Sequence, residues 1–235
     1  MIKNLYKVAV EYGLLTSNPL LSISIRRPKG STVKTYRPFT REELVKIFDY
    51  LNKKTDVSRQ WVINALLCSG GRSGEIIRLR TGDIKKSKAG AYYFNFVHRP
   101  RDEYPTSLKG GDAGERRTPL HQRLINKGYH NTISNGEDGY LMNAYTQGTS
   151  SWTSWFRDAI LKPLSIYEPG TTGLHSLRNS AIDLWRESGI DAEFRRAFVA
   201  HASKDVQDKI YDQGLKNMPE VLAPEINKLD LSWLP

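Results

Sequence analysis

Residues 174–211 contain four side chains whose types suit chemistry on a phosphate group: His175, Arg178, His201 and Tyr211. A tyrosine hydroxyl can attack phosphorus, and an arginine can hold two phosphate oxygens through paired hydrogen bonds. A phenol with a pKa of about 10 is mostly neutral at pH 7, so Tyr211 needs a base, and histidine titrates in the right range. These residue types predict cleavage of a phosphodiester bond without a metal ion, with His175 as the general base.

Helices must position these side chains. A helix beginning at Ser176 would place His175 and Arg178 on one face at its N-terminal end, where backbone N–H groups point outward. His201 would follow directly after a second helix, and Tyr211 would lie in a third. The apolar spacing predicts these helices over residues 176–188, 192–199 and 204–215.

A second stretch, SGGRSGEIIRLRTGDI, follows a run over 58–68 that is apolar on most faces and predicts a buried helix. The glycine pair at 70–71 should end that helix, and a new helix should begin at Ser73 with Glu75 in its first turn. Arg72 between them is a candidate to bind phosphate oxygens. Taken alone, the pattern also fits a structural ion pair between Arg72 and Glu75.

Together the two stretches resemble the signature blocks of the tyrosine recombinases, the phage-integrase family. LHSLRNS, AHAS and the following IY are similar to the family's HxLRH, GH and tyrosine, and RSGEIIRLRTGDI is similar to RxxEhxxLxxxDI. Ala200 stands where the family usually has Gly, and Asn179 where a His is common. The resemblance covers roughly residues 36–215 and implies catalytic roles for Arg72, His175, Arg178, His201 and Tyr211.

The resemblance also implies the fold: mainly α with a small antiparallel β-sheet (α+β), the integrase catalytic-domain fold. The stretch 91–98 (AYYFNFVH) predicts a strand, and ERRTPL a returning strand. The family has a catalytic lysine on the hairpin turn. Lys109, in LKGG ahead of RRTPL, matches this general acid best, and the competitors are Lys85, Lys86 and Lys88, which we expect on the preceding turn.

Two further helices are predicted outside the motifs. FTREELVKIFDYL has Thr40 as N-cap and Glu43 three residues later, which together predict a capping box. Residues 151–161 place Trp152 and Phe156 on one apolar face, which favours a role in the core.

The domain organisation follows from the resemblance. Residues 1–35 resemble the last helix of a core-binding domain plus a linker, so the chain is expected to be a fragment, and 36–235 the catalytic domain with a C-terminal tail. An ordinary N-terminal helix packed on its own core is the alternative. The basic linker 26–38 would follow the DNA backbone or be a solvated tether. The apolar tail after Tyr211 would dock on a neighbouring protomer or on its own domain.

Composition narrows the class of protein. A formal charge of +10 and a pI of about 9.6 favour a polyanionic partner such as nucleic acid. The sequence has no apolar run long enough to span a membrane and no signal peptide pattern, so a cytoplasmic, nucleoid-associated location is expected. A lone cysteine, Cys68, excludes an internal disulfide framework and a Cys-based zinc site, and is expected to be a small buried apolar residue.

The resemblance implies site-specific DNA recombination through a 3′-phosphotyrosyl intermediate, with double-stranded DNA at attachment sites as partner and a homo-tetramer on two duplexes. Because the phosphotyrosine conserves the energy of the broken bond, no cofactor, metal or ATP is expected. Two alternatives remain: a type IB topoisomerase, which would relax DNA as a monomer, and a DNA-binding remnant that has lost the reaction.

Overall fold

The computed structural model describes residues 2–23, 35–102, 105–132, 148–200 and 214–235. The chain divides into two compact units, Met1–Lys34 and Thr35–Pro235. Within the part of the chain that is described, no helix has the length and apolar character needed to cross a membrane.

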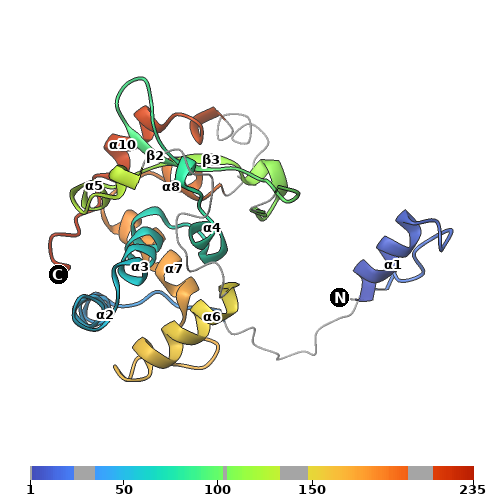
Figure 1. The fold of residues 1–235 in the computed structure, drawn as a ribbon, viewed down its shortest axis with the longest axis horizontal. Helices are drawn as coiled ribbons and strands as arrows, with labels where there is room; N and C mark the ends of the chain where they lie inside the picture. The colour runs from blue at the N-terminus through green and yellow to red at the C-terminus, as the bar shows by residue number, and fades with distance from the viewer. Residues whose placement is uncertain (1, 24–34, 103–104, 133–147, 201–213) are drawn as a thin grey trace. The chain divides into compact units, whose positions relative to one another are not determined.

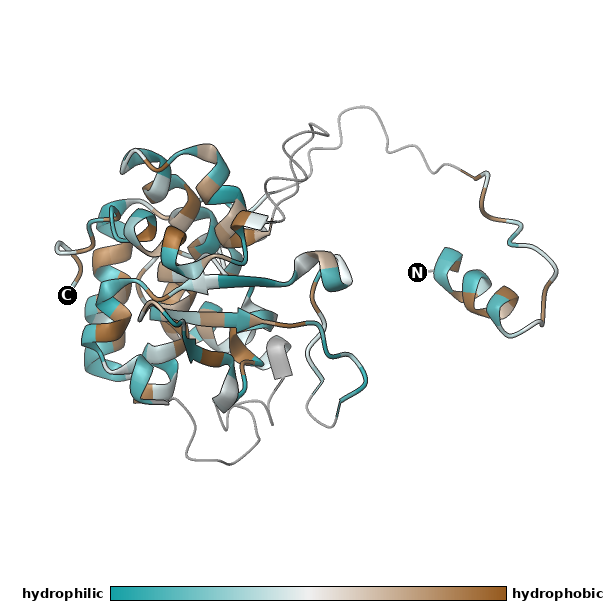
Figure 2. Cartoon of the chain, turned by 90° about the horizontal axis from the view of Figure 1, so that it is seen from above, coloured by the Kyte–Doolittle hydropathy of each residue, from teal (hydrophilic) through white to brown (hydrophobic). Residues whose placement is uncertain are grey.

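The first unit contains helix α1 (Ile2–Glu11), which ends before Gly13, where φ is +70°. None of the residues of α1 is buried, and Ile2, Leu5 and Val8 are all exposed. Figure 2, coloured by hydropathy, shows hydrophobic and hydrophilic residues together along this helix.

The second unit is mainly helical (Figure 1). Its α-helices in the described residues are α2 (Arg41–Lys54), α3 (Val57–Ser69), α4 (Ser73–Ile77), α5 (Gln122–Asn126), α6 (Gly148–Trp155), α7 (Leu174–Glu187), α8 (Ala192–Val199) and α10 (Pro219–Ile226). Short 3-10 turns cover Thr81–Asp83, Gly111–Gly114 and Tyr129–Thr132, and a π-helical turn covers Phe156–Leu161.

Local sequence chemistry explains several of these boundaries. Thr40 and Glu43 form the expected capping box at the start of α2. Asp56 accepts a hydrogen bond from the Arg59 N–H and caps α3, which is buried from Trp61 to Ser69. Helix α7 begins two residues earlier than predicted, so His175 lies within its first turn.

A three-stranded antiparallel sheet of order β1-β2-β3 packs against the helices of this unit. Its strands are β1 (Ile84–Lys86), β2 (Tyr92–Phe96) and β3 (Arg116–Pro119), with Phe94 opposite both Ile84 and Thr118. The expectation that Lys85 and Lys86 lie on a turn is wrong, because both belong to β1. The predicted fold class, mainly α with a small antiparallel sheet, is confirmed.

The core of the second unit is built by apolar residues of α2, α3, β2, α7 and α8. Trp152 and Phe156, expected to be core residues, are 4% and 0% exposed, and Cys68 is 1% exposed. Burial raises the pKa of the Cys68 thiol to about 12, which keeps it protonated at neutral pH.

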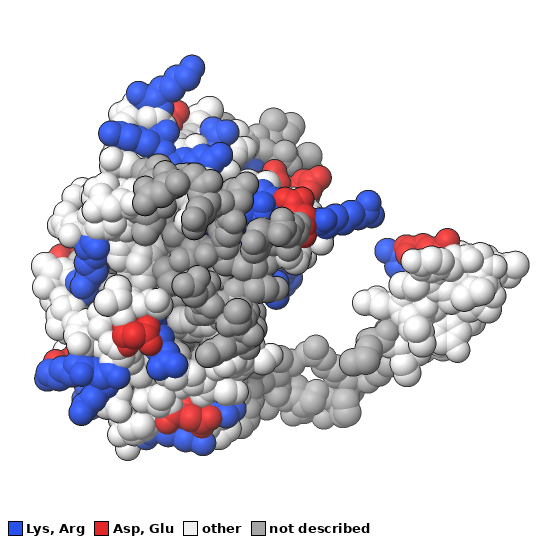
Figure 3. All heavy atoms as spheres, in the orientation of Figure 1, with Lys and Arg blue, Asp and Glu red and all other residues white. Residues whose placement is uncertain are grey.

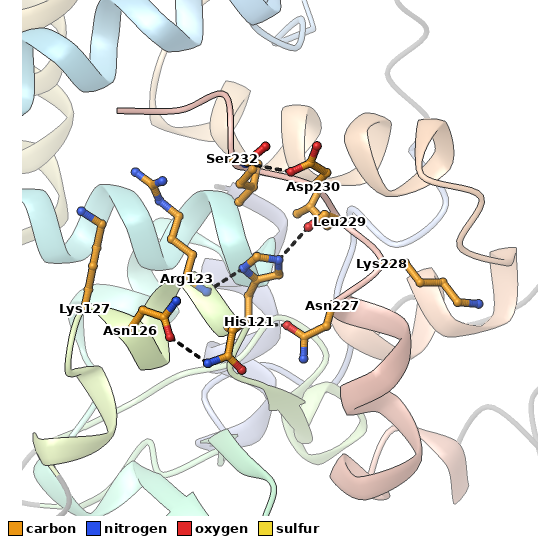
Figure 4. A pocket seen from close by; sticks show the side chains of 11 residues that line it. His121, Arg123, Asn126, Lys127, Asn227, Lys228, Leu229, Asp230 and Ser232 are labelled. Carbon is orange, nitrogen blue, oxygen red and sulfur yellow. Dashed lines mark hydrogen bonds between the residues drawn. The ribbon is translucent and has the colours of Figure 1, made fainter.

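The described C-terminal residues pack back onto their own domain, with α10 against β3 and α8. Leu222, Ile226 and Leu229 are buried there. Figure 4 shows the groove between this segment and α5, where the His121 ring contacts the Leu229 carbonyl at 2.8 Å and the Asn227 side chain accepts from the Gln122 N–H. These bonds fix the segment after α10 against the domain.

Candidate active site

Arg178 connects two segments that are far from it in the sequence. Its side chain lies inside the second turn of α7 and is 2% exposed. One guanidinium nitrogen donates to the Gly70 carbonyl at 2.5 Å and the other to the Val199 carbonyl at 3.3 Å. Gly70 lies two residues before Arg72, and Val199 two residues before His201. Arg178 therefore lies next to the turn that carries Arg72 and to the helix end that precedes His201.

The glycine at position 70 allows this close approach. Gly70 has φ of +59° and ends α3, a conformation that costs little only for glycine. A Cβ atom there would lie 2.6 Å from the Trp185 ring of α7. The sequence therefore needs glycine both to turn the chain into Arg72 and to let α3 pack against α7.

Arg72 is held by Glu75, and Glu75 is shared with a second arginine. The Arg72 guanidinium donates to Glu75 at 2.8 Å, and the Arg72 N–H donates to the same carboxylate at 3.0 Å. Arg116 of β3 donates at 2.6 Å to Oε2 of Glu75, the oxygen that also accepts from the Arg72 N–H. The side chains of Glu75 and Arg116 are 2% and 0% exposed, whereas that of Arg72 is 23% exposed. Arg72 is therefore the member of this trio that solvent or a ligand can reach.

Arg116 makes further contacts that fix it in place. Its Nε donates to the Phe198 carbonyl at 2.9 Å, and Nη1 donates to the Gly114 carbonyl at 3.1 Å. Its guanidinium also lies 4.0 Å from the centre of the Phe96 ring. These contacts join β3, the hairpin before it and the end of α8.

Arg116 and Arg178 both donate hydrogen bonds to carbonyls at the C-terminal end of α8. The last carbonyls of a helix have no partner within the helix, and cations are favourable at that end. Here Arg116 and the Thr118 hydroxyl both donate to the Phe198 carbonyl, while Arg178 donates to the next one, Val199. Ala200 then ends the helix in the left-handed region, with φ of +49°.

The surrounding charges shift the pKa values of Glu75 and Arg178. Burial would raise the pKa of Glu75, but the charge of Arg116 and hydrogen bonds from both arginines outweigh it and hold the pKa at about 2. Burial, followed by the charges of Arg72 and Arg116, lowers the pKa of Arg178 to about 9. A bound anion close to Arg178 would favour the charged guanidinium and raise this pKa.

His175 lies at the surface of the same region. Partial burial of its ring, followed by the charges of Arg178, Arg72 and Lys109, lowers its pKa. The imidazole therefore stays neutral at neutral pH, which is the form that accepts a proton. The same three charges show which cations lie near the ring.

Lys109 is exposed on the connection between β2 and β3, directly before Gly110, where φ is +97°. Of the four lysines considered from the sequence, Lys109 is the one whose charge acts on His175. Lys85 and Lys86 lie in β1, and Lys88 lies in the turn between β1 and β2.

Two of the residues expected in the site, His201 and Tyr211, lie outside the described residues. The structure brings together Arg72, Arg178 and His175, with Lys109 near enough for its charge to act on the imidazole. Sequence reasoning missed the role of Arg116. Its signal was the RRTPL segment: side chains alternate along a strand, so one of the two adjacent arginines had to point inward.

On the face of the second unit seen in Figure 3, the Lys and Arg of the described residues are scattered rather than gathered in one block, with Asp and Glu among them. This agrees with the dispersed positions of the basic residues in the sequence.

By sequence, no family model matches the chain, and no curated protein matches it. The fold is that of the tyrosine recombinase (integrase) catalytic domain, because the solved structures that resemble it are proteins of this class. An integrase from mycobacterium phage Brujita is similar with a TM-score of 0.58 and 16% identity, over 97% of this chain and 69% of that chain.

Two other similar structures are of recombinases bound to a substrate or core site. The XerH site-specific recombinase bound to a palindromic difH substrate gives a TM-score of 0.51 and 19% identity, over 84% of this chain and 55% of that chain. A lambda integrase dimer (residues 75–356) bound to a COC′ core site gives 0.52 and 17% identity, over 88% and 70% of the two chains. The chain thus spans between about half and seven tenths of these proteins.

Proposed function

We propose that this chain is the catalytic part of a site-specific DNA recombinase that cuts and rejoins DNA through a 3′-phosphotyrosyl intermediate. The observation that carries the proposal is the position of Arg178. Its hydrogen bonds to the Gly70 and Val199 carbonyls join α7 to the turn before Arg72 and to the end of α8, although these segments are far apart in the sequence.

In the proposed reaction, the Tyr211 oxygen forms a bond to phosphorus while the bond from phosphorus to the 5′ oxygen breaks. The Tyr211 proton passes to His175, whose lowered pKa keeps it neutral and able to accept it. Lys109 gives a proton to the departing 5′ oxygen. A 5′ hydroxyl from another strand then reverses the step, so strand exchange is the same reaction run twice.

The remaining groups stabilise the charge that develops on phosphorus. Arg72 and Arg178 would hold the two non-bridging oxygens through charge-assisted hydrogen bonds, and His201 would donate to the same oxygens. Arg72 is available because Glu75 shares its charge with the buried Arg116 and leaves the Arg72 side chain partly exposed. None of these steps uses a metal ion or ATP.

The partners follow from the same proposal. Residues 1–35 would belong to a core-binding domain and linker, and the substrate would be double-stranded DNA at attachment sites. One structurally similar protein is a lambda integrase tetramer bound to a Holliday junction, with a TM-score of 0.52. We extend that assembly to this chain as a homo-tetramer on two duplexes.

A covalent-adduct assay tests the proposal. The protein and its Tyr211→Phe variant are incubated with a pool of nicked genomic DNA in EDTA, and protein–DNA adducts are resolved on a denaturing gel. We expect an adduct from the unaltered protein and none from the variant. Tyr12→Phe is the matched control, since Tyr12 is 78% exposed in the first unit and should leave the adduct unchanged.

An adduct that persists in Tyr211→Phe would contradict the assignment of the nucleophile. No adduct, with salt-dependent DNA binding intact, would favour the DNA-binding remnant. Relaxation of supercoiled plasmid by a monomer without strand exchange would favour the topoisomerase.

The general acid has its own test. Lys109→Met should slow cleavage by about 10²–10⁴-fold. A substrate with sulfur in place of the 5′ oxygen should restore the rate, because a thiolate leaves without a proton. Lys86→Met is the control and should leave the rate unchanged. A rate loss in Lys86→Met that the sulfur substrate restores would instead assign the general acid to Lys86 of β1.

A further inference from the structure

Residues 36–39 are fixed along the start of α7 by backbone and side-chain hydrogen bonds. The Asn179 amide donates to the Tyr36 carbonyl at 2.5 Å, and the Phe39 N–H donates to the Ser180 hydroxyl at 2.8 Å. The Arg37 N–H donates to the Thr171 carbonyl at 2.8 Å. The segment that leads into the second unit is therefore anchored on both sides of His175.

The Arg37 side chain strengthens this anchor. Its guanidinium pairs with Glu43 of α2 at 2.7 Å and with Glu168, before α7, at 2.6 Å. With two carboxylates from different segments on one guanidinium, the backbone at Arg37 has little freedom to shift. Tyr36 directly precedes Arg37 in the chain, so these ion pairs also restrict the backbone position of Tyr36.

The Tyr36 ring lies against the His175 ring. The ring centres are 5.7 Å apart with the planes tilted by 58°, which is within the range of favourable aromatic contacts. Tyr36 is 39% exposed, so the ring covers the imidazole on one side while the other face of Tyr36 remains in solvent.

Gly173, the residue before α7, makes room for this ring. A Cβ atom at Gly173 would lie 2.9 Å from Cε1 of Tyr36, which is closer than real Cβ contacts allow. The backbone of Gly173 is extended, with φ of 170°, so steric space and not its dihedral angle explains the glycine. The glycine and the hydrogen bond from Asn179 both favour the same position of the Tyr36 ring.

We propose that Tyr36 is a positioning residue for His175, holding the imidazole in one orientation and keeping water from one side of it. The proposal rests on the proposed function in that His175 is the general base. It also gives a role to Asn179, where the resembled family often has histidine: in this chain its amide holds the Tyr36 backbone.

The direction of the effect follows from the groups around the imidazole. Burial has the largest effect on the pKa of the imidazole, and the positive charges of Arg178, Arg72 and Lys109 lower it further. Replacing Tyr36 by a small residue admits water, so the pKa of His175 should rise toward its ordinary value. A base whose pKa rises is protonated at higher pH, so activity at acidic pH falls first.

A histidine titration by NMR tests the contact without relying on activity. The C2–H signal of His175 is assigned with His175→Gln and followed with pH in the unaltered protein, in Tyr36→Phe and in Tyr36→Ala. We expect His175 to titrate in Tyr36→Phe as in the unaltered protein, and at a higher pH in Tyr36→Ala. Gly173→Ala, which displaces the ring, should shift the titration in the same direction.

The pH profile of adduct formation then tests the role in the reaction. In Tyr36→Ala the acidic limb of the profile should shift to higher pH, so the rate at pH 8 is reduced less than the rate at pH 6. In Tyr36→Phe the acidic limb should lie where it does in the unaltered protein. Asn179→Ala should move it by a smaller amount, and Tyr12→Ala should not move it.

Each outcome decides the proposal. Identical titrations in Tyr36→Phe and Tyr36→Ala would overturn it. A shifted titration with an unshifted pH profile would also overturn it, since His175 would then not be the base. If the unaltered protein forms no Tyr211-dependent adduct, the proposed function fails, while the NMR titration still decides whether Tyr36 controls His175.

Discussion

The two arginines proposed to bind the phosphate lie in different surroundings. Arg72 belongs to a trio in which the buried Glu75 carboxylate accepts hydrogen bonds from both Arg72 and Arg116. Arg178 donates to two backbone carbonyls, and burial, followed by the charges of Arg72 and Arg116, lowers its pKa. Arg72 is hydrogen-bonded to the Glu75 carboxylate, whereas the charge of Glu75 offsets only part of the effect of burial and neighbouring charges on Arg178.

The difference indicates a division of work within one site. A buried ion pair contributes when both partners are present and destabilises strongly when one is lost. At Arg178, burial and the charges of Arg72 and Arg116 outweigh the charge of Glu75, so a bound anion would favour the charged guanidinium. We therefore expect the Glu75 side to control folding and the Arg178 side to control catalysis, and both sides meet at the last carbonyls of α8.

The largest expected effect is on stability at Glu75. Glu75→Gln leaves Arg116 buried without a counter-charge and should lower the free energy of unfolding by about 3–5 kcal/mol, measured by urea denaturation. Glu187→Gln is a control, because the Arg41–Glu187 pair is exposed on both sides and should contribute little. Equal effects of the two substitutions would contradict the comparison.

The same carboxylate predicts a dependence of stability on pH. The pKa of Glu75 is about 2 in the folded protein and 4.5 is its ordinary value. Its stabilising contribution is therefore complete above about pH 4.5 and is lost as the pH falls toward 2. In Glu75→Gln this part of the acid dependence should disappear from denaturation curves recorded between pH 2 and 6.

A substitution at Arg178 should affect the rate of the reaction more than the stability of the fold. Arg178→Lys should slow adduct formation by about 10²–10³-fold, because lysine cannot reproduce the paired hydrogen bonds to phosphate oxygens. Its free energy of unfolding should change less than that of Glu75→Gln. Rates come from single-turnover cleavage and DNA affinity from gel shifts, and a loss of affinity that accounts for the whole rate effect would argue against a role in the transition state.

The smallest expected effect is on stability at Ala200, the residue that ends α8. Ala200 has φ of +49°, a conformation that costs an alanine about 1 kcal/mol relative to glycine. Ala200→Gly should therefore raise the free energy of unfolding by roughly that amount. Ser165→Gly, at φ of +58°, should give a similar gain away from the candidate residues. A loss of stability in Ala200→Gly would show that the alanine methyl group packs favourably.

The parts of the fold that depend on neighbouring residues could be predicted from the sequence. The capping box at Thr40, the buried helix α3 and the glycine at its end follow from local rules of helix formation. Strand β1 was missed because it has three residues and two of them are lysines. Such a short polar strand exists only because β2 pairs with it.

The same limit applies to the site. Arg116 could not be assigned from the sequence because its partners, Glu75 and Phe198, are 41 and 82 residues away. Tyr36 was missed because its ring meets His175 across a long intervening stretch. His201 and Tyr211 fall outside the described residues, and their roles stay predictions.

The sequence by itself determined which chemical groups the chain carries and in what order: arginine, lysine, histidine and tyrosine at spacings that suit phosphodiester chemistry. The tertiary structure decided which groups are buried and with which partners. It buries Arg178 beside carbonyls of α3 and α8, pairs both Arg72 and Arg116 with Glu75, and places Tyr36 against His175. The physical reason is that spacing along a helix or strand is a local property, whereas burial and ion pairing depend on contacts between residues far apart in the chain.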